Sequence, residues 1–539
     1  MSIANSGVQY GFAVEDACGF KVLYKYHLLY IYCIPRKLLG KTDSLSLCIF
    51  AVKNSFIKMI IVKFLKKLFR PLVYIIVAGF LIIVIRAWDS RSMPSLDAWH
   101  TIPIEKELLI NNQYEDIDSY LVDEDAYIRR LFSKVADSAL GKFNRYNPKS
   151  ISYPLFQDDN LNASFVLDPG VKNTKGVILL LHGLSDSPYY MRALGKVFKD
   201  EGFYVFALRL PGHGTLPSGL INVTWQEWYE ATEWGVEQLH EIAKQRGEVP
   251  LYMGGFSTGG ALVLNYSYKA MNSKEMHNPE KVFLFSPAIG VSNLAVVSAW
   301  HKTLSWIPYF EKFKWLDILP EYDPVKYNSF TKNAGRQIYL LTEENKELVK
   351  QIAASGRQGE LPAIISFQSL VDATVIPKDL FEMYQEIGTS KDELFVFDIN
   401  RVYKDFIKED VLHINPRNIR FTQESKPKLH MLINNVEFDS IYGPIACGIY
   451  ELSDKNELID IYPEHHTTWP FEYFAMSHVS VPIAPDNAAY GQNSILGRLS
   501  VHGERGVLLI PSDELTRTRY NPFFELMKME IHDFIHSKE

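Results

Sequence analysis

The most informative stretch of this 539-residue sequence is Leu251-Tyr252-Met253-Gly254-Gly255-Phe256-Ser257-Thr258-Gly259-Gly260-Ala261. Its apolar first residues are typical of a short buried strand, and the run from Gly260 to Leu264 is typical of a helix start. Between them stands a G-x-S-x-G pattern centred on Ser257. A strand-to-helix turn of this kind strains the serine backbone and leaves its hydroxyl at the tip of a sheet. The context therefore favours a nucleophilic Ser257 over an ordinary glycine-rich turn.

The chain around this stretch alternates apolar strands with amphipathic helices. Helices are expected from the capping box Thr224-Trp225-Gln226-Glu227 to about Ile242, and after Asn521-Pro522. Further strands are expected at residues 163–167, 177–181, 204–208, 281–286, 363–367, 393–397 and 428–433. This alternation predicts an α/β fold for residues 161–539, with a mostly parallel, doubly wound sheet that carries helices on both faces.

Two segments interrupt the alternation. Residues 290–340 are rich in aromatic side chains and are interpreted as a helical cap insert that lines an apolar acyl pocket. The ordinary core of a helical excursion explains the same pattern equally well. Residues 400–475 are interpreted as a second insert with one further strand. Before the main domain, residues 91–160 are polar and irregular and are interpreted as a stalk and lead-in.

Residues 59–90 carry the clearest targeting signal. A basic flank at residues 63–70 precedes an uncharged apolar run of 14 residues at 72–85, and Arg86 and Trp88 follow it. The run is short for a membrane span, but Arg86 can extend to the membrane interface, where Trp88 is also favoured. No small-residue cleavage site follows. We therefore expect an uncleaved signal anchor that spans about residues 71–88; a buried core helix is the alternative.

Composition narrows the remaining possibilities. Residues 1–58 are an N-terminal extension of open role, because Met59 begins a more conventional anchor than Met1 does. An apolar content of 47% and a charged content of 22% are ordinary for a globular protein. The net charge of −7 and the lack of a basic stripe argue against a nucleic-acid partner. Cys447 is the single cysteine after Cys48, so the body cannot form an internal disulfide.

From about Asn162 to its C-terminus, the chain resembles the α/β-hydrolase superfamily. Within it, the likeness is to the serine aminopeptidase-like, monoacylglycerol lipase-like and lysophospholipase-like group. The matching motifs are His182-Gly183, Pro211-Gly212-His213-Gly214, Gly255-Phe256-Ser257-Thr258-Gly259 and the loop from Asp372 to Pro377. They occur in the order of the family, which is more specific than any one motif. The apolar anchor is similar to that of bacterial membrane-tethered members.

The resemblance implies a triad of Ser257, Asp372 and His478, in the chain order that this fold uses. Asp372 would fix the imidazole tautomer and stabilise the imidazolium. His478 opens a loop, as the histidine of the family does, but it follows Asp372 by 106 residues, a long gap that the second insert would explain. His532 and His536 are set aside as bases because they lie on the terminal helix. The other histidines after Asp372 are His413, His430, His465, His466 and His502.

The resemblance also implies an oxyanion hole made by the backbone N–H groups of Thr258 and Leu184. Removal of one such donor typically costs about 3 kcal/mol of transition-state stabilisation. Chemistry of this kind needs neither a metal nor a cofactor. The adjacent pair His465-His466 lacks the spacing of metal ligands and is interpreted as surface.

These features together predict a membrane-tethered serine hydrolase that cleaves carboxylic esters through an acyl-enzyme. The expected substrates are acyl lipids such as monoacylglycerols or lysophospholipids. The basic flank places the catalytic domain on the non-cytoplasmic side, which in a bacterium is the periplasmic face of the inner membrane. One alternative is an aminopeptidase-like enzyme in which Asp186 holds the substrate amine, and the other is a binding or scaffold protein that is catalytically silent. The acyl chain length and the oligomeric state stay open.

Overall fold

The computed structural model describes residues 21–25, 28–32, 71, 73–81, 84, 93–104, 107–108, 114–290, 308–371, 374–400, 427–434, 445–452, 457–465, 467–470, 473, 475–491 and 517–537. The chain divides into two compact units, Met1–Arg86 and Ala87–Glu539. Each unit is described by itself.

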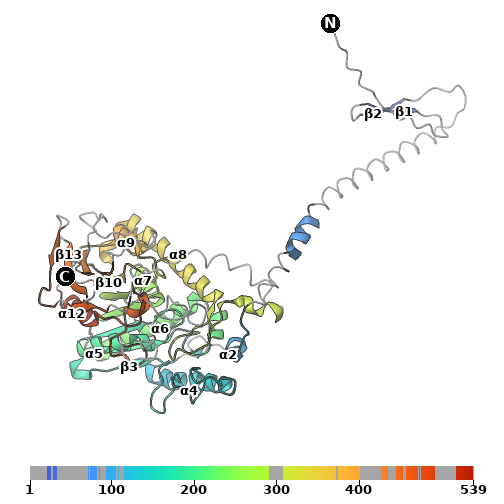
Figure 1. Cartoon of the computed structure of the whole chain (residues 1–539). Coiled ribbons are helices and arrows are strands. Elements are labelled where there is room, and N and C mark those ends of the chain that lie inside the picture. The colour runs from blue at the N-terminus through green and yellow to red at the C-terminus, as the bar shows by residue number, and fades with distance from the viewer. Residues whose placement is uncertain are drawn as a thin grey trace, which may run out of the picture. The chain divides into compact units, whose positions relative to one another are not determined.

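The described part of the first unit holds a β-hairpin and a helical segment (Figure 1). Strands β1 (Lys21–Lys25) and β2 (Leu28–Tyr32) pair in antiparallel fashion. The helical segment covers residues 71, 73–81 and 84, and its large apolar side chains are exposed. The basic flank at residues 63–70 lies outside the described residues. Within the described parts of the chain, the helices fall short of the length and apolar character that a membrane crossing requires.

The second unit is built on a large sheet, in which the described strands follow the order β14-β13-β12-β11-β10-β7-β6-β4-β5-β3. Neighbouring strands from β12 to β5 run parallel, and β3 pairs antiparallel at one edge. The strands of this part are β3 (Phe165–Leu167), β4 (Gly176–Leu181), β5 (Phe203–Leu208), β6 (Leu251–Phe256), β7 (Lys281–Phe285), β10 (Ala363–Ser369), β11 (Glu393–Asp398) and β12 (Lys428–Asn434). The predicted mostly parallel α/β sheet is confirmed.

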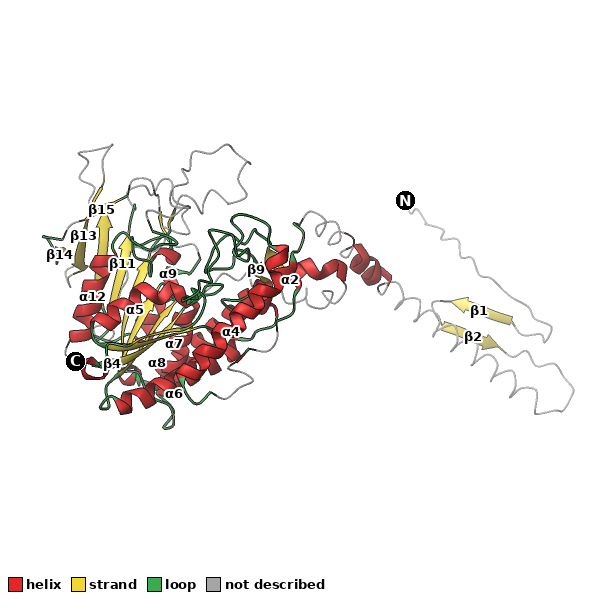
Figure 2. Cartoon of the chain, turned by 90° about the horizontal axis from the view of Figure 1, so that it is seen from below, coloured by secondary structure: helices red, strands yellow, loops and turns green. Residues whose placement is uncertain are grey.

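Helices cover both faces of this sheet (Figure 2). The helices are α5 (Arg192–Asp200), α6 (Trp225–Gln245), α7 (Thr258–Ala270), α8 (Lys332–Ser355), α9 (Pro377–Ile387) and α12 (Phe524–His536). Side chains along β4 alternate between two hydrophobic cores: Leu179 packs with residues of α6 to α9, whereas Ile178 and Leu180 pack with residues of α5 and α12. A strand that is buried on both faces explains the continuous apolar run at this position.

The predicted capping box at the start of α6 is present. The Thr224 hydroxyl accepts a hydrogen bond from the backbone N–H of Glu227 at 3.3 Å, and the Glu227 carboxylate accepts one from the N–H of Thr224 at 2.6 Å. Two of the N–H groups at the helix start, which have no partner within a helix, are thereby satisfied.

The strand predicted at residues 428–433 is present as β12, but residues 400–475 hold further strands that the sequence did not predict. After β12 the sheet continues through β13 (Ile445–Leu452), which pairs antiparallel with β12 and also with β14 (Leu458–Asp460) and β15 (Thr467–Trp469). These strands extend the sheet beyond its parallel part. Their sequence alternates weakly because Gly448 and the polar residues of β14 and β15 interrupt the apolar pattern that marks a strand.

Residues 91–160, interpreted as a stalk, contribute packed structure to the second unit. Helices α2 (Ala98–Thr101) and α4 (Ile117–Val135) carry much of a third hydrophobic core that includes Trp99, Phe132 and Tyr146. The sequence of these helices does not indicate that they are packed in the core, because some of their buried side chains are polar and form ion pairs. Glu124 on α4 is fully buried and lies 2.7 Å from the Arg209 guanidinium.

The described part of the predicted cap insert consists of short elements that lead into α8. A 3₁₀ helix (Pro308–Lys314) leads into the hairpin of β8 (Trp315–Asp317) and β9 (Phe330–Thr331), and α8 follows at once. Phe313 and Trp315 are buried, and the Trp315 ring meets His100 edge-on at 4.8 Å. Trp315 therefore packs against the lead-in, and Phe313 lies beside Lys332 of α8, at 5.7 Å from its ammonium, rather than lining an acyl pocket. Residues 291–307 lie outside the described part.

Candidate active site

Ser257 occupies the sharp turn between β6 and α7, in the conformation that its motif predicts. Its backbone has φ +50° and ψ −112°, which a residue with a side chain rarely adopts. Such strain costs on the order of 1–3 kcal/mol and persists only where the surroundings impose it. Here the Ser257 N–H donates to the Phe285 carbonyl at 3.1 Å, and its carbonyl accepts from the N–H of Ala288 at 3.0 Å.

Two glycines permit this turn to pack against its neighbours. A Cβ on Gly259 would lie 2.1 Å from the carbonyl oxygen of Leu181, at the end of β4. A Cβ on Gly255 would lie 2.3 Å from the carbonyl carbon of Gly259. Both contacts are with backbone, which cannot move aside, so the turn accepts only glycine at these positions.

The loop after β4 lies directly against the nucleophile turn. A Cβ on Gly183 would meet the Phe256 ring at 2.8 Å, and Ser185 adopts a left-handed φ of +64°. Leu184, one predicted oxyanion donor, is half-buried within this loop. Thr258, the other, is the first residue of α7, where backbone N–H groups have no partner within the helix. Both donors thus belong to segments that border Ser257.

His182 and His213, the histidines of the two motifs before Ser257, are buried and hydrogen-bonded within the fold. The N–H of Leu210 donates to His182 Nε2 at 3.0 Å, so His182 Nδ1 carries the proton and donates to the Gly183 carbonyl at 2.8 Å. Burial lowers the pKa of His182 well below its usual value and that of His213 to about 3. Both imidazoles are therefore neutral at pH 7. Through its bond from the N–H of Leu210, His182 links the loop after β4 to the loop after β5.

The loop after β5 is also held by the lead-in. Arg209 donates to Glu107 at 2.9 Å, to Glu124 at 2.7 Å and to the carbonyl of His213 at 2.9 Å. The N–H of Gly212 donates to Glu107 at 2.8 Å. Because these side chains are buried, the pairs are shielded from water, and residues before the hydrolase motifs help to fix the shape of the site.

His478 lies next to the nucleophile turn. It begins a 3₁₀ helix (His478–Ser480) and is 8% exposed, and its ring stacks on Phe256 with centroids 6.0 Å apart and planes inclined by 22°. Burial lowers the pKa of His478 well below its usual value, and the positive charges of Lys326 and Arg517 lower it further. A neutral imidazole is the form that can accept a proton.

Asp372 lies outside the described residues, but the chain that leads to it is placed. Strand β10 ends at Ser369, whose hydroxyl donates to the carbonyl of Met476 at 2.7 Å. Ser369 precedes Asp372 by three positions and Met476 precedes His478 by two. The segments that carry the predicted acid and the predicted base are thus hydrogen-bonded to each other.

The other described histidines after Asp372 have different surroundings. His430 lies on β12 and bonds Glu530 at 2.8 Å, and His465 is exposed on a turn. His532 and His536 bond Glu201 on the surface. His413, His466 and His502 lie outside the described residues. Among the described candidates, His478 is the one whose ring contacts the nucleophile turn.

A polar cavity of about 90 Å³ is lined by Val479, the residue after His478, and by Lys326 and Arg517, whose charges act on His478. Its lining combines three cations, one carboxylate and four tyrosines with two other residues: Lys326, Arg517, Arg519, Asp323, Tyr190, Tyr322, Tyr327, Tyr490, Asn328 and Val479. Tyr190 also stacks on Phe256, at 5.8 Å and 3°. Sequence reasoning missed these residues because they come from four separate segments of the chain and no motif includes them.

Asp186, the candidate partner of a substrate amine, already lies beside the ammonium group of Lys326. It is 2% exposed, and one carboxylate oxygen lies 3.5 Å from the Lys326 ammonium. Burial raises its pKa to about 6, although Lys326 acts in the opposite direction. A buried carboxylate that already has a cation beside it is poorly suited to bind a second one.

Comparisons with known proteins agree with this geometry. Residues 172–375 match the family described as serine aminopeptidase, S33. The chain is 34% identical over 87 residues to a thermostable monoacylglycerol lipase of Bacillus sp. (strain H-257), which is 16% of this chain and 33% of that protein. It is 30% identical over 91 residues to a carboxylesterase of Bacillus subtilis (strain 168), which is 17% of this chain and 35% of that protein.

Among solved structures, a soluble variant of monoglyceride lipase from Saccharomyces cerevisiae matches with a TM-score of 0.33 and 18% identity, over 43% of this chain and 81% of that one. The chain spans about a third of the length of the curated relatives. The family match confirms the expected resemblance to α/β-hydrolases of the monoacylglycerol lipase-like group.

Proposed function

We propose that this α/β-hydrolase cleaves carboxylic esters, with Ser257 as nucleophile, His478 as base and Asp372 as the acid that orients the base. The observation that carries the proposal is the stacking of His478 on Phe256, the residue before the strained Ser257. Strain at a buried nucleophile turn, a neutral imidazole beside it and a family match point to the same chemistry.

The reaction follows from these positions. The Ser257 hydroxyl attacks the ester carbonyl carbon while His478 accepts its proton, and the backbone N–H groups of Thr258 and Leu184 stabilise the oxyanion. His478 then gives that proton to the leaving alcohol as the bond between carbonyl carbon and ester oxygen breaks. Water, deprotonated by His478, attacks the acyl-enzyme; the bond between the acyl carbon and the Ser257 oxygen then breaks, and His478 returns the proton to that oxygen as the acid is released.

A fluorophosphonate probe and short p-nitrophenyl esters test this reaction. We expect stoichiometric labelling of the wild-type protein and none of Ser257→Ala. Ser355→Ala, which removes an exposed serine hydroxyl, is the matched control and should label fully. Absence of labelling in a folded wild-type protein would support the binding or scaffold alternative instead.

For the substrate, we propose an ester that carries a negatively charged group close to the scissile bond, as in a lysophospholipid. The cavity beside His478 supports this choice, since three of its lining side chains are cationic and one is anionic. At about 90 Å³ it is smaller than a typical pocket for a whole ligand and suits a head group rather than an acyl chain.

Matched lipids test the charge preference. With one acyl chain, the ratio of kcat/KM for an acyl-glycerol phosphate to that for the monoacylglycerol should exceed one in the wild type. Arg517→Gln should lower this ratio by about tenfold and leave the hydrolysis of the neutral ester largely unchanged, because one charge-assisted hydrogen bond to a phosphate contributes about 1.5 kcal/mol. A ratio of one or less in the wild type would contradict the charge preference. Equal ratios above one in both proteins would show that Arg517 is not its source.

The peptidase alternative is less well supported because Asp186 is buried beside Lys326. Hydrolysis of amino-acid p-nitroanilides provides the comparison. If Ser257-dependent cleavage of these amides exceeds that of p-nitrophenyl esters, relative to the uncatalysed rate of each, the peptidase assignment replaces the esterase one.

We also propose that the chain is tethered to a membrane through residues 59–90, with the catalytic unit on the non-cytoplasmic side. The exposed apolar helical segment at residues 73–81 and the basic flank before it support the tether. The protein should sediment with membranes, and its C-terminal unit should be cut by a protease added from the non-cytoplasmic side. Protection of that unit in sealed, right-side-out membranes would contradict the orientation.

A further inference from the structure

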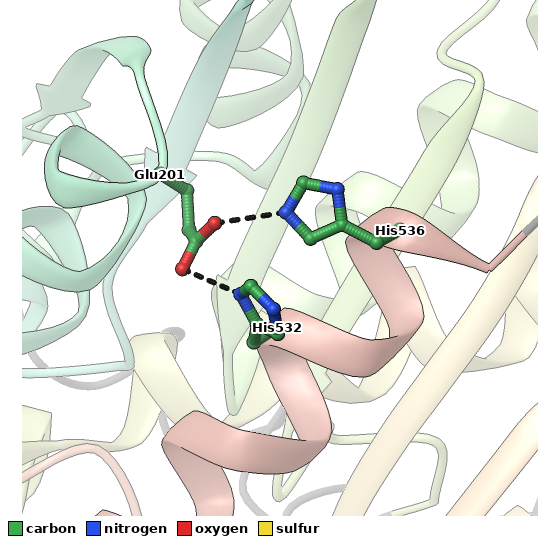
Figure 3. A group of neighbouring side chains, drawn as sticks. All are labelled: Glu201, His532 and His536. Atoms are coloured by element: carbon green, nitrogen blue, oxygen red, sulfur yellow. Dashed lines mark hydrogen bonds and ion pairs between the residues drawn. The ribbon is translucent and has the colours of Figure 1, made fainter.

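Three side chains that the proposed reaction does not use converge at the surface (Figure 3). His532 and His536 are four positions apart on α12 and therefore face the same side of that helix. Glu201 follows the end of α5 and comes from a point 331 residues before His532 in the chain. Both imidazole rings point toward its carboxylate.

The distances between these groups are those of ligands around one small cation. His532 Nδ1 lies 2.9 Å from Oε1 of Glu201, and His536 Nε2 lies 3.1 Å from Oε2. The three ligand atoms lie within 4.8 Å of one another. Zinc bonds of about 2.0–2.1 Å in a tetrahedral site place neighbouring ligand atoms about 3.3 Å apart, so small side-chain rotations would open room for the ion.

The surroundings allow an ion to enter. The side chains of His532 and His536 are 53% and 47% exposed, whereas that of Glu201 is 19% exposed. The backbone that carries the histidines is anchored, because Lys281 donates to the carbonyl of Ile535 at 3.1 Å and Ile531 is fully buried. Solvent can reach the fourth coordination position while the fold holds the other three.

We propose that Glu201, His532 and His536 form a binding site for zinc or a similar borderline divalent metal ion. Two imidazoles with one carboxylate favour such ions over magnesium and calcium, which prefer oxygen ligands. The fourth ligand is a water molecule.

The position of the site assigns it a structural role. Glu201 lies just before β5, at the amino end of that strand, whereas Ser257 follows the carboxyl end of β6. Both strands run parallel to β4, so the site lies at the amino ends of these strands and the nucleophile lies at their carboxyl ends. A bound ion would cross-link the C-terminal helix α12 to the end of α5 and stabilise the folded state by binding it selectively.

The buried group of Glu393, His430 and Glu530 resembles this site in composition but differs in its charge balance. There the Lys428 ammonium lies 3.0 Å from Glu393, and His430 bonds Glu530 at 2.8 Å. Burial of all three ligands also hinders the entry of an ion. The exposed site is therefore the one that we assign to a metal.

The test uses the full chain after removal of metal with EDTA and dialysis. Titration with zinc at pH 7.5 should show one binding site per chain and a rise in Tm. His532→Ala and His536→Ala should each weaken binding by more than about tenfold and abolish the rise, since even outer partners of metal ligands contribute 10–100-fold. His465→Ala, which removes an exposed histidine elsewhere, should bind as the wild type does.

Glu201→Gln separates the metal site from simple hydrogen bonding between Glu201 and the two histidines. It keeps an oxygen acceptor near the histidines but removes the anionic ligand, so zinc binding should weaken. A Tm that does not respond to zinc in the wild type, or equal binding by the His532→Ala and wild-type proteins, would overturn the assignment. Ester hydrolysis should persist in EDTA, which keeps this test independent of the proposed reaction.

Discussion

The ring of His478 stacks on the ring of Phe256, with centroids 6.0 Å apart and planes inclined by 22°. Phe256 ends β6 and is fully buried, so it is fixed by the sheet. Tyr190 stacks on Phe256 as well, at 5.8 Å. The imidazole and the Tyr190 ring thus both stack on Phe256, the residue that precedes the nucleophile, and this contact orients the ring of the proposed base.

Phe256 is therefore expected to be a positioning residue. Phe256→Leu keeps an apolar side chain but removes the flat surface on which His478 rests, so kcat should fall by about tenfold or more because small misplacements are costly in catalysis. KM should change little, since Phe256 lies under the base rather than in the cavity lining. Steady-state kinetics measure the split, and circular dichroism checks that the variant folds. An equal fall of kcat for Val263→Ala, a core change on α7, would indicate general loosening instead.

Activity should persist on the acidic side of pH 6.5. The base acts when neutral, and burial together with Lys326 and Arg517 lowers the pKa of His478 well below that of a free histidine. Lys326→Met removes one positive charge, which raises the pKa of His478, so the acidic limb of kcat/KM should move to higher pH. Rates for a neutral ester across pH 4–8 measure the shift. A limb that stays in place would show that another group controls it.

Gly259→Ala should prevent correct folding of the turn. The new Cβ would lie 2.1 Å from the backbone oxygen of Leu181, and overpacking against backbone cannot be relieved by a side-chain rotation. We expect a soluble yield or Tm well below that of the wild type. Gly359→Ala is the control, since nothing lies within 4 Å of its added Cβ. Wild-type stability of Gly259→Ala would contradict the packing described.

The sequence alone predicts those elements whose local residue pattern reflects their position in the fold. Strand β4 reads as a continuous apolar run because it is buried on both faces, and the elbow at Ser257 has a motif because the backbone contacts of Gly259 permit no other residue. The lead-in helix α4 reads as polar because its buried Glu124 is matched by Arg209, 85 residues later. A pairing over that distance leaves no local signal.

The same limit applies to the cavity and the metal site. Lys326 and Arg517 are separated by 191 positions, and Glu201 precedes His532 by 331. Residues that come together only in the folded protein, and that belong to no motif, cannot be assigned to one site from their spacing in the sequence. His478 could be proposed from the sequence because it follows Asp372 in the order of the family motifs, and its role as the base stays a prediction.

The pair of Arg209 and Glu124 should contribute strongly to stability. Both side chains are fully buried, and removal of Glu124 leaves the buried donors of Arg209, Ser164 and Tyr120 without their acceptor, which together typically costs about 3 kcal/mol or more. Glu124→Ala should therefore lower the free energy of unfolding by about that amount in urea titrations. The exposed pair of Lys244 and Glu241 provides the control, and Glu241→Ala should change it by less than about 1 kcal/mol. Similar effects of the two variants would show that Arg209 is compensated by Glu107 alone.

The stability of the fold should fall in mild acid because several histidines are buried in the neutral form. Burial lowers the pKa of His100 to about 4 and that of His213 to about 3, whereas an unfolded histidine titrates near 6.5. Between pH 6.5 and these values the unfolded chain binds protons that the folded chain does not. The free energy of unfolding therefore decreases as pH falls, by about 1.4 kcal/mol per pH unit for each such histidine.

His100→Gln isolates one of these contributions. His100 Nδ1 accepts from the N–H of Asp97 at 2.9 Å, and its Nε2 therefore carries the proton that bonds Ser329. A glutamine can make similar hydrogen bonds but does not titrate, so the dependence of stability on pH between 6.5 and 4 should become shallower by about one proton. Urea titrations at half-unit intervals of pH measure that slope. An unchanged slope would mean that folded His100 also binds a second proton, on Nδ1, in this pH range, which the hydrogen bond from the N–H of Asp97 to Nδ1 opposes.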